Sequence, residues 1–170
     1  MKKLEVRLQS DSQNSRVVGW LAEQNRKIYI EYSPDFLRNP LWLSPFKLAP
    51  KAGALEYRDL NFGPIFGLFD DSLPDGWGLL LMDRALRKIG ISPHSASPLD
   101  RLAFLGSRTM GALTYHPATN DEHQAQEILD LHIMSKEVKK IWAGSVEEVL
   151  PQLLRAGGSP GGARPKILVG

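Results

Sequence analysis

Three strand-like segments lie within residues 4–32, and they constrain the fold more than any other part of the sequence. Residues 4–9 place Leu or Val at every second position, with charged or polar residues between them. A period of two is typical of a strand with one buried face. A short apolar run at 17–21 indicates a second strand, and residues 27–32 alternate again. The sequence therefore predicts an antiparallel meander over residues 4–32.

Beyond residue 64 the apolar residues take the spacing of helices. We expect a helix that begins with a capping box between Ser72 and Asp75 and runs to Ile89. Its buried stripe is expected to consist of Leu79, Met82, Leu86 and Ile89. The same capping pattern recurs at Ser97 and Asp100, where we expect a helix over 97–105 to begin. The remaining elements expected from the pattern are a strand over 112–115 and helices over 127–142 and 145–155. Strands followed by helices predict an α+β fold with a small antiparallel β subdomain.

The segment between residues 33 and 64 is rich in proline, and we expect it to be irregular. Its apolar side chains are too many for a free linker, and we expect them to cover the sheet. They are Leu41, Trp42, Leu43, Phe46 and Leu48.

Composition excludes several classes of function. The chain has 170 residues, a net charge of +2 and no cysteine, so disulfides and cysteine nucleophiles are excluded and no strong field for nucleic acid is expected. The four histidines lack the spacing of a metal site. Glu5 and Arg7 interrupt any signal-peptide core, and no apolar run is long enough to cross a bilayer. We therefore expect a cytoplasmic protein without membrane association.

A glycine-rich stretch at residues 157–166 carries the strongest chemical signal. It contains four glycines, Ser159 and the cations Arg164 and Lys166. Glycines allow several backbone N–H groups to converge on one anion, so the stretch is a candidate phosphate nest. An ordinary surface loop is the alternative, because the stretch matches neither the Walker A nor the dinucleotide-binding pattern.

Three segments together resemble the N-terminal part of the HipA family of bacterial toxin kinases. Residues 69–76 (FDDSLPDG) resemble the family's F-x-N-L-L-P-E-G segment. Residues 102–115 (LAFLGSRTMGALTY) resemble its L-L-x-x-I-G-x-D-x-x-G-A-L segment. Residues 159–166 (SPGGARPK) resemble its S-x-G-G-A-R/Q-P-K loop. The order of the three segments is also that of the family.

The resemblance implies a division and a set of site residues. Residues 1–117 would form a HipA-like N-terminal subdomain, and residues 118–170 would begin a kinase N-lobe that carries the glycine-rich loop. Ser159 would be the autophosphorylation site that switches the kinase off. The residues that would line ATP are Gly161, Gly162, Ala163, Arg164, Pro165 and Lys166.

The resemblance also implies cofactors and partners. ATP and Mg²⁺ would serve a serine/threonine kinase whose partner is a HipB-like helix-turn-helix antitoxin and whose substrate is a protein such as an aminoacyl-tRNA synthetase. DNA would be contacted only through the antitoxin.

The catalytic and magnesium-binding aspartates of the family lie beyond the loop, and no aspartate follows Asp130. We therefore expect that the chain contains no catalytic residue and no metal ligand. We expect it to be a piece of a longer kinase that does not phosphorylate any substrate alone. The alternative is a non-enzymatic module that binds an antitoxin or regulates a kinase in trans, with Trp20 and Trp42 at its interface.

Overall fold

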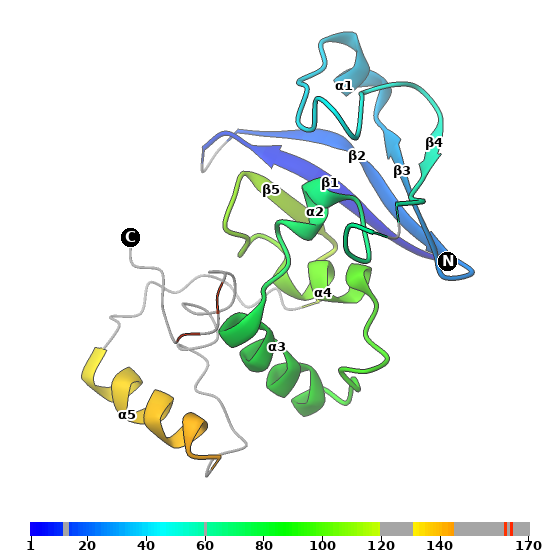
Figure 1. Cartoon of the computed structure of the whole chain (residues 1–170). Coiled ribbons are helices and arrows are strands. Elements are labelled where there is room, and N and C mark those ends of the chain that lie inside the picture. Colours follow the sequence, from blue (N-terminus) through cyan, green and yellow to red (C-terminus); the bar gives the residue numbers. More distant parts are fainter. Residues whose placement is uncertain (12–13, 60, 120–130, 145–161, 163, 165–170) are drawn as a thin grey trace. The chain divides into compact units, whose positions relative to one another are not determined.

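The computed structural model describes the chain except for residues 12–13, 60, 120–130, 145–161, 163 and 165–170 (Figure 1). The chain forms two compact units. Unit 1 contains Met1–Leu73 and Ser97–Asp121, and unit 2 contains Pro74–Ala96 and Glu122–Gly170. Each unit therefore combines two separate stretches of the sequence.

A five-stranded antiparallel sheet is the framework of unit 1. Its strands are β1 (Lys2–Gln9), β2 (Ser15–Gln24), β3 (Lys27–Tyr32), β4 (Ala54–Glu56) and β5 (Leu113–His116). The strand order is β4-β3-β2-β1-β5, so β1 pairs with β2 on one side and with β5 on the other. The predicted meander and the α+β class are confirmed.

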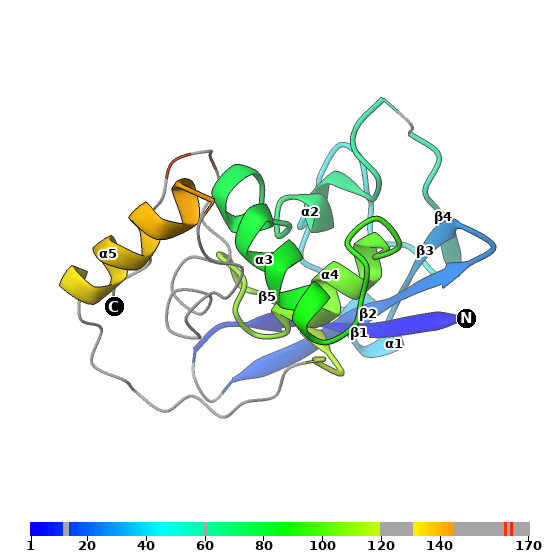
Figure 2. The ribbon, with the colours of Figure 1, turned by 90° about the horizontal axis from the view of Figure 1, so that it is seen from below.

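Alternation along the strands sets which face is buried. Val6, Leu21 and Ile30 are fully buried on one face, and their sequence neighbours Trp20 and Glu31 lie on the other. The helices α2 (Gly67–Asp70) and α4 (Pro98–Leu105) lie on the buried face (Figures 1 and 2). A T-shaped ring contact of 6.5 Å between Phe69 and Tyr115 connects α2 to β5.

The start of α4 follows the sequence prediction. Ser97 is the N-cap, its hydroxyl accepts from the Asp100 amide, and the Asp100 carboxylate accepts from the Ser97 amide at 2.9 Å. The Lys2 ammonium adds an ion pair of 2.5 Å to the same carboxylate. This reciprocal capping box ties the first residues of β1 to α4.

The segment 33–64 differs from its prediction. It holds a short helix, α1 (Pro34–Arg38), and the edge strand β4, so it is not wholly irregular. Of its apolar side chains, Leu48 is buried as expected, but Leu41, Trp42 and Phe46 do not cover the sheet. The loop turns back at an isolated bridge between Ser44 and Leu48. Of these two residues only Leu48 is buried.

Unit 2 contains α3 (Gly76–Lys88) and α5 (Leu131–Trp142). The predicted capping box at the start of α3 is wrong, because Asp75 is the N-cap and the Ser72 hydroxyl instead bonds the Tyr115 hydroxyl at 2.8 Å. The predicted stripe is correct at Met82 and Leu86 but not at Ile89, which follows the end of the helix and is exposed.

The other helices expected from the pattern are tested only in part. α5 lies within the helix expected at 127–142, whereas the expected helix at 145–155 lies outside the described residues. Among the helices that are described, none is long and apolar enough to cross a bilayer.

Candidate functional site

The glycine-rich stretch contacts the start of α3 through two hydrogen bonds at a single residue. The Gly162 amide donates to the Asp75 carboxylate, which is 87 positions earlier in the sequence. The Gly162 carbonyl accepts from the Trp77 amide at 3.1 Å. Two segments that the sequence analysis singled out separately therefore meet within unit 2.

The local structure explains why a glycine at position 162 and an aspartate at position 75 suit this contact. The first N–H groups of a helix have no partner within the helix. At α3 the Gly162 carbonyl takes one of them, because the Asp75 side chain does not cap its own helix and turns to the Gly162 amide instead. Gly162 adopts a φ of 103°, in the region that favours glycine.

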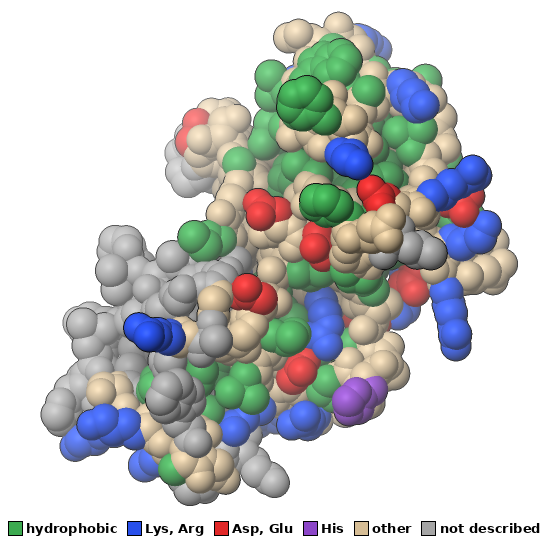
Figure 3. Space-filling model, in the orientation of Figure 1, with side chains coloured by type: hydrophobic (Ala, Val, Ile, Leu, Met, Phe, Trp, Pro, Cys, Tyr) green, Lys and Arg blue, Asp and Glu red, His purple; other side chains and the backbone are tan. Residues whose placement is uncertain are grey.

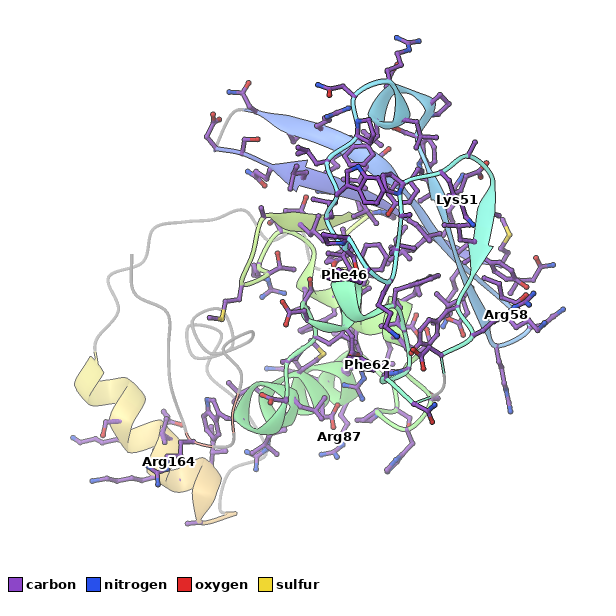
Figure 4. The ribbon with its side chains drawn as sticks, turned by 45° about the horizontal axis from the view of Figure 1, so that its top comes forward. Phe46, Lys51, Arg58, Phe62, Arg87 and Arg164 are labelled. Carbon is purple, nitrogen blue, oxygen red and sulfur yellow. The ribbon has the colours of Figure 1, made fainter. Side chains whose placement is uncertain are left out.

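Electrostatics at this end of α3 favour anions. A helix N-terminus carries roughly half a positive charge, and the Asp75 carboxylate lies there. Arg164 follows two residues after Gly162 and its side chain is exposed (Figure 4). Arg87 is also exposed, but it lies in the last turn of α3, roughly 18 Å along the helix from Asp75. Arg164, and not Arg87, is therefore the described cation that accompanies the loop.

Trp77 anchors the start of α3. Its side chain is only 2% exposed, and within the described part of the chain its indole N–H has no hydrogen-bond partner. The large buried ring holds in place the backbone amide that reaches Gly162, so the position of the loop contact depends on core packing.

The structure describes two of the predicted nucleotide-lining residues, Gly162 and Arg164. The others, Gly161, Ala163, Pro165 and Lys166, lie outside the described residues, as does Ser159. Their roles stay predictions. The contact of Asp75 and Trp77 with the loop was missed, because hydrogen bonds across such a long separation leave no periodic signal in the sequence.

Asp70 and Asp71, which precede this site in the sequence, belong to unit 1. Burial and the neighbouring charge of Asp71 raise the pKa of the Asp70 carboxyl. A side chain at Gly63 would approach this carboxyl to 2.6 Å. In the described ranges no group of three or more His, Asp or Glu side chains is arranged to hold a metal ion.

Comparison with known proteins shows the family. Residues 12–116 match the family model described as the HipA N-terminal domain, which is more than half of the chain. The chain belongs to this family. HipA proteins are kinases of toxin–antitoxin systems, as the resemblance implied. No curated protein and no solved structure gives a significant match.

The matched range of this HipA N-terminal domain includes two of the three segments that resemble the family. Residues 69–76 and 102–115 lie inside it, and the glycine-rich residues 159–166 lie after it. The family therefore rests on the segment from β2 to β5 and on the helices within it. The function of the loop has to be argued from its own geometry.

Proposed function

We propose that this HipA N-terminal domain is the N-terminal part of a serine/threonine protein kinase and that residues 159–166 form the loop that covers the phosphates of ATP. In such a kinase the γ-phosphoryl group passes from ATP to the hydroxyl oxygen of a protein serine or threonine. ADP leaves, and the hydroxyl proton is released.

The observation that carries the proposal is the bond between the Gly162 amide and a carboxylate. A phosphate oxygen is an acceptor of the same anionic kind, so an amide that donates to Asp75 is also suited to a phosphate. The absence of a side chain at Gly162 leaves the backbone accessible. Arg164 adds an exposed positive charge two residues away.

The proposal also limits what these 170 residues do. We assign neither a catalytic aspartate nor a magnesium ligand to them, so we expect them not to transfer phosphate alone. ATP and Mg²⁺ are cofactors of the proposed kinase. A HipB-like antitoxin, a protein substrate such as an aminoacyl-tRNA synthetase, and operator DNA reached through the antitoxin are its proposed partners.

ATP titration by calorimetry tests the loop assignment. The protein is expressed from its whole reading frame, with Gly162→Val and Lys166→Ala as variants. We expect each to weaken ATP binding at least about tenfold, equivalent to about 1.4 kcal/mol, because one blocks the backbone and the other removes a positive charge. Asp75→Asn should not weaken binding, because it removes only an anion that competes with phosphate for the Gly162 amide.

Gly111→Val is the matched control for the glycine variant, because an added Cβ at Gly111 meets no atom within 4 Å. Its ATP affinity should equal that of the wild type. If Gly162→Val and Lys166→Ala also bind ATP normally, the loop does not cover the nucleotide.

Self-phosphorylation tests the proposed switch at Ser159. A phosphoserine adds nearly two negative charges to a loop suited to phosphates, so it would take the place of ATP. Ser159→Ala should abolish self-phosphorylation and preserve phosphorylation of a protein substrate, measured by phosphopeptide mass spectrometry. The exposed Ser107 provides a control, Ser107→Ala, that should leave both activities unchanged. A phosphate found on another residue of the wild type would exclude Ser159.

A second candidate function is a non-enzymatic interaction module. Trp42, one of the two tryptophans expected at its interface, is 59% exposed and favours this function. Trp20 is half-buried and lies 5.0 Å from the Lys3 ammonium. The module hypothesis prevails if the product of the whole reading frame binds no ATP and phosphorylates no protein.

A further inference from the structure

Unit 1 exposes a group of large apolar side chains far along the sequence from the glycine-rich loop. Leu41 is 51% exposed, Trp42 59%, Phe46 96% and Phe62 64%. We call these four residues the exposed aromatic patch. Large apolar surfaces that remain in water commonly mark sites of interaction.

The first loop of the exposed aromatic patch is held firmly. The Leu48 amide donates to the Ser44 carbonyl at 3.1 Å and closes a tight turn. The Leu48 side chain is buried, and its carbonyl accepts from the Tyr32 hydroxyl at 3.1 Å. Phe46 therefore stands in water at the tip of an anchored turn, and its exposure does not come from a loose chain end.

The second loop is anchored in the same manner and is connected to the first. The Tyr57 hydroxyl contacts the carbonyl oxygens of Asp59, Phe62 and Gly63, the last two at 2.9 Å, and it donates to one at a time. The Lys47 ammonium lies 5.8 Å from the centre of the Phe62 ring and 3.3 Å from the Asp59 carboxylate. Lys47 thereby joins the loop of Phe46 to the loop of Phe62.

Positive charge accompanies the exposed aromatic patch. Lys51 precedes β4 and Arg58 follows it, and Figure 4 shows both beside this edge strand of unit 1. Arg58 shares the Glu56 carboxylate with Lys27, so one anion serves two cations. Lys51 has no ion-pair partner among the residues that the structure describes. Figure 3 shows hydrophobic side chains over the loops beside α1 and β4, with Lys and Arg side chains and also Asp and Glu side chains among them.

These observations favour a protein partner over a nucleic acid. Sequence-independent binding of nucleic acid rests on many phosphate contacts, whereas only a few cations accompany the patch. Leu41 offers no flat ring on which a base could stack. Aromatic and arginine side chains around an apolar centre are typical of the residues that contribute most to protein interfaces.

We propose that the exposed aromatic patch binds an acidic segment of a partner protein. An apolar or aromatic side chain of that segment would pack against Phe46 and Phe62, and its carboxylates would pair with Lys51 and Arg58. The proposal involves no residue of the glycine-rich loop. It can therefore succeed or fail independently of the proposed nucleotide function.

Selection from a random peptide library displayed on phage tests the chemistry of the partner directly. The 170-residue chain is the target, and the double variant Phe46→Ser/Phe62→Ser is used to remove peptides that bind elsewhere. Because both phenylalanines are exposed, circular dichroism and the melting temperature of this variant should match those of the wild type. We expect the enriched peptides to combine Asp or Glu with an apolar or aromatic residue.

Fluorescence anisotropy of one enriched peptide then measures how much the apolar and the charged side chains of the patch each contribute to binding. Phe46→Ser/Phe62→Ser and Lys51→Glu/Arg58→Glu should each weaken binding at least about tenfold. Added salt should weaken binding to the wild type and have less effect on the charge-reversed variant. Ile89→Ser, at an exposed apolar residue of unit 2, is the control and should bind like the wild type.

Three results would overturn the proposal. One is the absence of peptides that distinguish the wild type from the double phenylalanine variant, and another is enrichment of basic or uncharged peptides. The third is tighter binding of single-stranded oligothymidylate than of the selected peptide, lost in the same two variants, which would make the patch a nucleic-acid site.

Discussion

At the scale of the residue, Gly19 shows that crowding can require glycine without any unusual backbone angle. It pairs with Val6 on one side and Tyr32 on the other. A Cβ there would lie 2.2 Å from the Glu31 carbonyl oxygen and 2.8 Å from the Tyr32 Cα. Both atoms belong to the backbone of β3, so the strand itself would have to move.

Gly19→Ala should therefore lower the free energy of unfolding by about 1–3 kcal/mol, as overpacking of a core does. Urea denaturation followed by circular dichroism measures this change. Gly111→Ala, where an added Cβ meets open space, should stay within about 0.5 kcal/mol of the wild type. Equal stability of the two variants would contradict the close approach at Gly19.

Two serines show which residue roles the sequence can predict. Ser97 was predicted correctly as a helix cap, because its partner Asp100 lies three positions away in the same turn. Ser72 was assigned the same role by the same pattern, but its hydroxyl bonds Tyr115, 43 positions away. A capping motif is local, whereas the tertiary contact that replaces it is not, so only the first can be recognised from the sequence.

At the scale of the element, the start of α4 depends on the ionisation of Asp100. Burial opposes ionisation of its carboxyl, but the hydrogen bonds from Lys2 and Ser97 outweigh that effect and lower its pKa below the ordinary 3.8. Because the pKa is lower in the folded state than in the unfolded chain, the charge stabilises the fold above the ordinary value. That contribution is lost as the pH falls through the folded pKa.

Asp100→Ala should lower stability at pH 7 by about 1 kcal/mol, the usual cost of losing a cap. The difference from the wild type should shrink below about pH 4, because the wild-type carboxyl is then protonated too. Thermal unfolding across this pH range measures it. Lys2→Ala removes only the half-exposed ion pair and should cost less. A difference that does not vary with pH would show that the charge of Asp100 is unimportant.

The length of an element decides whether it can be predicted from the sequence. The three long strands of unit 1 and α3 were predicted because their apolar periodicity extends over several turns or pleats. α1 and β4 contain 5 and 3 residues, which is too short for a period to be recognised. The exposure of Phe46 was missed for a related reason, since composition alone does not show which way a five-residue turn points.

At the scale of the whole molecule, the family was recognisable from the sequence, but the contact at the candidate site was not. The matched residues 12–116 contain β2, β3, β4 and β5, whereas β1, which pairs with β2 and β5, precedes them. The sequence predicted the glycine-rich loop and the start of α3 as separate motifs. Their meeting at Gly162 depends on packing around the buried Trp77, which no local pattern encodes.

The strand order of unit 1 has a consequence for protein synthesis. Of the five strands of this sheet, β1 leaves the ribosome first and β2 can pair with it soon afterwards, but the other edge of β1 is paired only by residues 113–116. Until residues 113–116 are made, the nascent sheet therefore presents the unpaired backbone groups of β1, a surface that favours pairing with other chains. β5 is synthesised more than a hundred residues after β1. The pairing of β1 with β5 is therefore delayed by the order in which the chain is made.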